Sequence, residues 1–185
     1  MTPKVAAILP ALNEEETIGP IIDVLQKSGL IDEIVVVADG CTDRTAERAR
    51  ARGATVYEFK ENRGKGQAVR QGVIKTSAPI LLLLDTDLLG LTVNHIRMLL
   101  EPVMQGKLVM NAGYKDRGPL TPFSSHILMA GQRALKREIF TKIPVRLLRG
   151  YSQEVALNYY CKLHKLPFGH QVLPGLDFRK KIEKV

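Results

Sequence analysis

The chain has 185 residues, of which 45% are hydrophobic and 25% charged, with a net charge of +8 and two cysteines. This balance is typical of one soluble globular domain. Since no apolar run reaches the ~18 residues of a membrane span and two cysteines argue against a disulfide framework, we expect a cytoplasmic protein. The positive charge favours anionic partners. Aromatic residues are few and do not interleave with the basic clusters, so we expect phosphorylated or membrane-surface partners and no nucleic acid.

Strands and helices alternate along the first part of the chain. Hydrophobic periodicity predicts strands over residues 4–10, 33–38, 54–59 and 79–84, and helices over residues 15–28, 43–52 and 66–76. A further helix is expected from Thr92 to about Gln105, followed by a strand over 108–112. This order predicts an α/β fold with a mostly parallel central sheet and helices on both faces.

The alternation ends after Gly113. Residues 114–125 are rich in Gly, Pro and Ser and predict a long loop, of a length that often serves function. A helix over 153–164, a strand over 168–173 and a basic tail over 177–185 complete the chain. No internal repeat or linker divides it, so we expect a single domain over residues 1–185.

Two carboxylates, Asp85 and Asp87, end the apolar run of residues 78–84. Two anions held this close repel each other, and a divalent cation such as Mg²⁺ or Mn²⁺ is the usual remedy because hard cations take oxygen ligands. The simpler alternative is an Asp-rich turn after a strand.

Polar residues also follow the other predicted strands. They are Pro10, Asn13 and Glu14 after the first strand, Asp39 after the second, and the loop 62–66 with Lys65 after the third. Each has a structural alternative, as a helix cap, a turn or a solvated loop. Because ligands bind beyond the carboxyl ends of strands in open parallel sheets, four such strand ends together predict a binding site.

These segments resemble the successive motifs of family 2 glycosyltransferases. The resemblance rests on residues 10–15, 35–45, 62–66 and 85–87. Residues 131–135 and 150–154 extend it more loosely, and are similar to the acceptor half of polyprenyl-phosphate sugar synthases and glucosyl-3-phosphoglycerate synthases.

The resemblance implies a GT-A (Rossmann-like) fold that binds a nucleotide-diphosphate sugar in residues 1–90 and an acceptor in residues 91–185. Asp87 would hold a Mg²⁺ or Mn²⁺ ion, with Asp85 as a second ligand, and Glu154 would be the acidic residue of the acceptor site. Asp87 and Glu154 are thus the implied catalytic residues. The residues implied to contact the nucleotide sugar are Pro10, Asn13, Glu14, Asp39, Lys65, Asp85 and Thr86.

Two departures from the family pattern concern the carboxylates and the metal. Ala38 stands where an additional aspartate is common, and the C-terminal segment lacks the histidine that often completes the metal site. Asp177, in that segment, is a possible substitute.

The sequence therefore predicts a metal-dependent hexosyltransferase with a phosphorylated or polyprenyl-phosphate acceptor. Arg133, Arg146, Arg149 or the tail lysines would hold the acceptor phosphate, although any one of them could simply be a surface cation. One alternative is a catalytically impaired nucleotide-sugar-binding domain. A sugar-phosphate nucleotidyltransferase would need a Gly-rich loop after the first strand, where residues 10–16 are acidic and lack glycine. A homodimer and a peripheral contact with the inner membrane face remain open.

Overall fold

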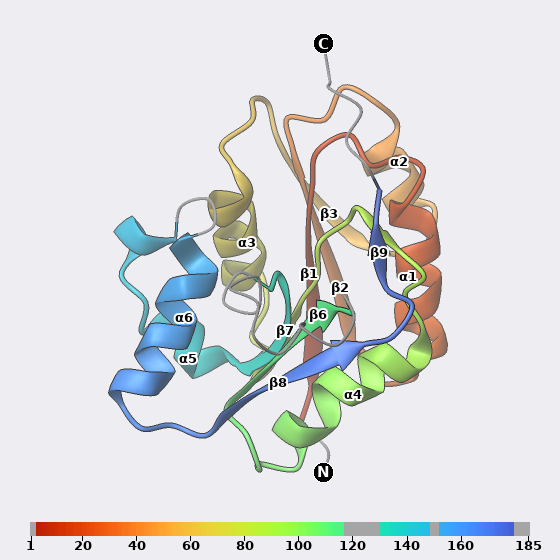
Figure 1. Ribbon diagram of the computed structural model, residues 1–185. Helices are drawn as coiled ribbons and strands as arrows, with labels where there is room; N and C mark the ends of the chain where they lie inside the picture. The colour runs from red at the N-terminus through yellow and green to blue at the C-terminus, as the bar shows by residue number, and fades with distance from the viewer. Residues whose placement is uncertain (1–2, 117–129, 149–151, 180–185) are drawn as a thin grey trace.

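A computed structural model describes residues 3–116, 130–148 and 152–179 (Figure 1). Its main sheet has seven strands in the order β3-β2-β1-β4-β7-β6-β8. These strands are β1 (Val5–Ala11), β2 (Glu33–Asp39), β3 (Thr55–Phe59), β4 (Ile80–Leu83), β6 (Met110–Lys115), β7 (Gln132–Lys136) and β8 (Phe168–Leu173). A small antiparallel sheet pairs β5 (Leu88–Leu89) with β9 (Asp177–Phe178). The predicted α/β fold with a mostly parallel sheet is confirmed.

Helices cover both faces of the sheet, as predicted (Figure 1). One face packs against α1 (Ile18–Lys27), α2 (Thr45–Arg50) and α4 (Val93–Met104). The other packs against α3 (Lys65–Ile74), α5 (Arg137–Thr141) and α6 (Ser152–Leu163). A short 3-10 helix, η3 (Val145–Leu147), lies between α5 and α6 in the chain.

The protein has one hydrophobic core on each face of the sheet. Successive side chains of β1 point to opposite faces, and all of them are buried, so this strand contributes to both cores. Val5, Ala7 and Leu9 belong to the core under α1 and α4. Ala6 and Ile8 belong to the core under α3 and α6. The central strand therefore has no polar side chain until it ends, and polar groups can gather only beyond its carboxyl end.

Strand β7 is the element that the sequence analysis missed. It is antiparallel to both β4 and β6 and lies between them. Its buried residues include Gln132 and Arg133, and these polar side chains break the apolar pattern by which strands are recognised. Because β7 runs against β4, its first residues lie at the carboxyl end of β4, beside Asp85.

The other differences concern boundaries. Strand β6 extends to Lys115, and most of the expected loop over 114–125 falls within residues 117–129, which lie outside the described residues. The expected basic tail begins with β9, while residues 180–185 also lie outside the description. Within the described part of the chain, no helix is long and apolar enough to cross a bilayer.

Close contact between α3 and β1 depends on Gly72, because a Cβ atom at this position would lie 2.5 Å from Cγ2 of Ile8. We expect Gly72→Val to lower the free energy of unfolding by about 1–3 kcal/mol through overpacking. The half-buried neighbour Gln71 is the matched control, because Gln71→Val should cost only the helix propensity, below about 0.7 kcal/mol. Urea unfolding measures both, and equal losses would contradict the packing argument.

Candidate functional site

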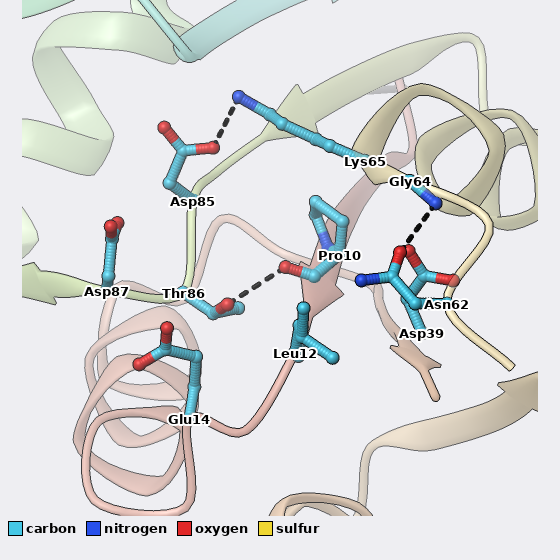
Figure 2. Close-up of a pocket in the computed structure, with 11 residues that line it drawn as sticks. Pro10, Leu12, Glu14, Asp39, Asn62, Gly64, Lys65, Asp85, Thr86 and Asp87 are labelled. Atoms are coloured by element: carbon cyan, nitrogen blue, oxygen red, sulfur yellow. Dashed lines mark hydrogen bonds and ion pairs between the residues drawn. The ribbon is translucent and has the colours of Figure 1, made fainter. Parts of the chain in front are cut away.

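A pocket opens beyond the carboxyl ends of β1, β2 and β4, where four elements of the chain meet (Figure 2). Its walls come from the ends of these strands and from the loop that leads into α3. The lining residues are Pro10, Ala11, Leu12, Glu14, Asp39, Asn62, Gly64, Lys65, Asp85, Thr86 and Asp87. Nearly all of the residues predicted to contact a nucleotide sugar therefore lie in one place. Asn13, Glu154 and Asp177, by contrast, are not among the lining residues.

Asp39 forms the wall at the end of β2 and is only 4% exposed. Its Oδ1 accepts a hydrogen bond of 2.7 Å from the backbone N–H of Arg63, which holds the loop before α3. The next residue, Gly40, has a φ of +73°, and a Cβ atom there would lie 2.5 Å from the backbone nitrogen of Asn62. The loops after β2 and β3 are thus packed together around the Asp39 carboxylate.

Asn13 shapes the loop after β1 instead of lining the pocket. Its side-chain oxygen accepts a hydrogen bond of 2.8 Å from the backbone N–H of Thr42, and its own N–H points to Sγ of Cys41 at 3.4 Å. The Cys41 thiol in turn donates to the carbonyl of Ala11. Burial raises the pKa of Cys41, so the thiol keeps the proton that this bond needs. Asn13 and Cys41 thus join the loops after β1 and β2.

Thr86 anchors the turn between the two aspartates. Its hydroxyl donates to the carbonyl of Pro10 at 2.9 Å (Figure 2), and its own carbonyl accepts from the hydroxyl of Thr17 at 2.5 Å. The Thr17 hydroxyl also lies 3.3 Å from a carboxylate oxygen of the buried Glu14. The backbone of the turn is therefore fixed, and with it the direction of Asp85 and Asp87.

Lys65 joins two carboxylates that are far apart in the sequence. Its Nζ lies 2.6 Å from Oδ1 of Asp85 and 2.9 Å from Oε1 of Glu154, which is 0% exposed. Burial lowers the pKa of Lys65, but the attraction of Asp85 and Glu154 outweighs this and raises it above its usual range. Gln132 donates to the other oxygen of Asp85 at 2.9 Å.

Arg133 is a second buried cation behind this network and is also 0% exposed. Its guanidinium donates to the carbonyls of Ala130 and Glu154 and to the side chain of Asn158. The described contacts of Arg133 are thus all within the protein, and a contact with an acceptor phosphate stays a prediction. Burial lowers its pKa, while the charges of Glu154 and Asp85 oppose that effect. Arg133 and Lys65 together balance the two carboxylates.

The remaining predicted residues lie outside the pocket. Asp177 is on β9, and its Oδ1 lies 2.6 Å from Nζ of Lys115, in an exposed ion pair. Arg146 is exposed on η3, and Arg149 lies outside the described residues. The sequence analysis missed Gln132, Thr17 and Gly131. A Cβ atom on Gly131 would overlap the Asp85 carboxylate. Gly131 begins the loosely matching segment 131–135, so its place in that segment was the sequence signal that could have identified it.

The pocket offers a divalent cation two carboxylates rather than a complete cage. Among the described residues there is no group of three or more His, Cys, Asp or Glu side chains that could hold a metal. Asp85 and Asp87 provide the hard oxygen atoms that Mg²⁺ and Mn²⁺ prefer, and phosphate oxygens commonly complete such a shell. The donor set therefore fits a cation that arrives with a diphosphate.

Known proteins resemble this chain in sequence and in fold. The family model for glycosyl transferase family 2 matches residues 6–155. The glucosyl-3-phosphoglycerate synthase of Mycolicibacterium smegmatis is 35% identical over 109 residues, which are 54% of this chain and 36% of that protein. The Petrotoga mobilis protein of the same name is 28% identical over 223 residues, covering 97% of this chain and 66% of its own length.

The crystal structure of glucosyl-3-phosphoglycerate synthase from Mycobacterium tuberculosis, in complex with Mn²⁺, UDP-glucose and phosphoglyceric acid, matches the fold with a TM-score of 0.83 at 26% identity. The match covers 97% of this chain and 72% of that one. Another structure of the same enzyme contains Mg²⁺ and uridine diphosphate. The chain spans only 36% of the length of the M. smegmatis relative and 66% of the length of the P. mobilis relative.

The position of Asp39 predicts a contact with the nucleoside that does not need a metal. Asp39→Asn keeps the shape but replaces an acceptor oxygen by a donor, so affinity for nucleoside diphosphates should fall about ten- to a hundredfold with or without Mn²⁺. Asp23→Asn, on α1 and paired with Arg52, is the control and should change nothing. A loss in calorimetry that appears only with Mn²⁺ would place Asp39 at the metal instead.

Removing one partner of the Lys65–Glu154 pair should be costly because Glu154 is buried. We expect Lys65→Met to cost about 3–5 kcal/mol, since it leaves a carboxylate without its cation. The double variant Lys65→Met/Glu154→Leu should lose clearly less than the sum of the single variants. The exposed pair Lys115–Asp177 is the matched control and should show a coupling below about 1 kcal/mol. Equal coupling energies in the double-mutant cycles of the Lys65–Glu154 and Lys115–Asp177 pairs would refute the buried-pair argument.

Proposed function

Because the chain belongs to glycosyl transferase family 2, we propose that it transfers a glucosyl group from UDP-glucose to a small phosphorylated acceptor of the 3-phosphoglycerate type. The observation that carries this proposal is the pocket in which Asp39, Lys65, Asp85 and Asp87 converge from the ends of β2 and β4 and the start of α3. In this proposal residues 1–90 bind the donor and residues 91–185 bind the acceptor.

The donor would lie along the pocket from β2 to β4. Asp39 would accept hydrogen bonds from the base or ribose, with Pro10 and Glu14 along the β1 side. Lys65 would approach the diphosphate as a point charge, and the fixed turn at Thr86 would present Asp85 to the ribose or the sugar.

Asp87, with Asp85, would hold a Mg²⁺ or Mn²⁺ ion. When bound, such an ion neutralises the charge that develops on the departing diphosphate. One crystal structure of the M. tuberculosis enzyme contains Mn²⁺ with UDP-glucose and another contains Mg²⁺ with uridine diphosphate, which supports a divalent ion beside the donor. Asp177 lies in an ion pair with Lys115, and we do not assign it to the metal.

Glu154 would serve the acceptor. Its Oε1 is held by Lys65, and its Oε2 has no hydrogen-bond partner among the described residues, although it is buried. A buried acceptor oxygen of this kind can take a hydrogen bond or the proton of a substrate hydroxyl. An acceptor that reacts through its phosphate would not need that step, because the phosphate is already anionic.

Three other possibilities remain from the sequence analysis. A polyprenyl-phosphate acceptor and a peripheral membrane contact are favoured by an exposed apolar face of α6. A catalytically impaired binding domain is favoured by Ala38, and opposed by the assembled pocket. A nucleotidyltransferase is disfavoured by the loop after β1, which is built from Leu12, Asn13 and Glu14 without glycine.

We expect purified protein to form glucosylated product from UDP-glucose and 3-phosphoglycerate when Mn²⁺ is present. Asp87→Ala should lower the transfer rate at least about a hundredfold and remove the extra thermal stabilisation that Mn²⁺ adds to bound uridine diphosphate. Asp23→Ala, on α1 outside the pocket, should behave like wild type. Mass spectrometry of the product and thermal unfolding measure the two effects.

Nucleotide binding without product from any acceptor would favour the impaired binding domain. Unchanged Mn²⁺ stabilisation in Asp87→Ala would reject the proposed metal ligand. Because these two readouts are independent, the metal assignment can fail while the transfer activity stands.

A further inference from the structure

The exposed large apolar side chains are concentrated in one region of the surface. Among the described residues, seven such side chains are exposed, and five of them lie on η3 and α6. These five are Val145 (50%), Leu147 (41%), Val155 (48%), Tyr159 (64%) and Leu163 (61%). Because η3 contacts α6, these five side chains lie on two neighbouring elements, and we call them together the α6 patch. Contiguous exposed apolar surface of this kind usually marks an interaction site.

The spacing along α6 places its exposed apolar residues on one side of the helix. Val155, Tyr159 and Leu163 recur every four residues, so they lie along one side of the helix. The opposite side carries Leu157 and Cys161, which are 0% exposed and belong to the core. A helix that is apolar on both sides is usually buried on both sides. The outer side of α6 therefore lacks a cover within the described chain.

The charges around the α6 patch indicate what covers it. Residues 139–165 contain five Lys or Arg residues and a single acid, Glu154. Lys142, Arg146, Lys162 and Lys165 are exposed, whereas Glu154 is buried and pairs with Lys65. Beyond this stretch, the exposed Glu138 on α5 is the nearest acid in the sequence. A second copy of the chain, docked symmetrically through this surface, would bring cations against cations.

We propose that the α6 patch binds the surface of an anionic lipid bilayer. Val155, Tyr159 and Leu163 would enter the boundary between headgroups and acyl chains, where tyrosine is favoured because its ring is apolar and its hydroxyl polar. Arg146 and Lys162 would reach the anionic headgroups with their charged ends while their stems stay on the apolar surface. Charge attraction and apolar burial thus act at the same surface.

This docking would place the acceptor side of the pocket near the membrane. Val155 directly follows Glu154, and the two side chains leave α6 on different sides, one exposed and the other buried against Lys65. The bilayer would therefore contact the outer side of the helix whose inner side carries Glu154, the partner of Lys65. The contact does not require the proposed transfer activity, and it can be tested without any substrate.

The test is sedimentation of the full chain with vesicles. We expect wild-type protein to bind vesicles of phosphatidylcholine with phosphatidylglycerol, to bind pure phosphatidylcholine at least about tenfold more weakly, and to dissociate as salt screens the charges. Val155→Glu/Tyr159→Glu should lower the partition coefficient about tenfold or more, because it places two anions in the interface. Lys162→Glu should also weaken binding, whereas wild-type affinity in that variant would contradict the electrostatic argument.

Matched controls separate the α6 patch from general effects of charge. Leu89→Glu adds an acid at an apolar residue that is 45% exposed on β5, and Arg97→Glu makes the same charge reversal on α4. Both should bind anionic vesicles like wild type, and circular dichroism should show that all variants fold. The proposal is overturned if wild type does not bind anionic vesicles, or if patch and control variants lose binding equally. It is also overturned if light scattering shows a dimer that Val155→Glu/Tyr159→Glu dissociates.

Discussion

The ion pairs of Lys65 with Asp85 and Glu154 are the interaction on which the rest of the site depends. Glu154 is 0% exposed, and a buried carboxylate without a cation would cost several kcal/mol. The lysine must therefore stand at the start of α3, where the loop after β3 turns toward both partners. Because Asp85 ends β4 and Glu154 lies on α6, this single side chain joins the part of the chain that we propose binds the donor to the part that we propose binds the acceptor.

The same constraint accounts for the second buried cation. Asp85 and Glu154 bring two negative charges, and Lys65 and Arg133 bring two positive charges, so the group is neutral as a whole. A diphosphate that attracts Lys65 would disturb this balance and leave Glu154 with less compensation. In the proposed function, donor binding at Lys65 would therefore be linked to the charge balance of Glu154, although the two residues are 89 positions apart in the sequence.

The parts of this arrangement that sequence could predict are those set by local pattern. Asp39, Asp85 and Asp87 follow apolar strands, and the end of a buried strand in a parallel sheet is where polar side chains must collect. Strand β7 was not predictable in this way, because Gln132 and Arg133 are polar yet buried through contacts with distant residues. For the same reason Arg133 resembled a surface cation. Its burial depends on α6, which is more than fifteen residues further along the chain.

Helix α6 shows why a pattern of residue types cannot by itself separate core from interface. Both of its sides are apolar, so the residue types alone do not show which side enters the core, and contacts with the rest of the protein decide it. The inner side is fixed by Glu154, since that carboxylate must reach Lys65. Once this contact is made, the period of the helix turns Val155, Tyr159 and Leu163 outward, whatever they then contact. The requirement of the buried ion pair thus determines the apolar surface that the protein presents beside its site.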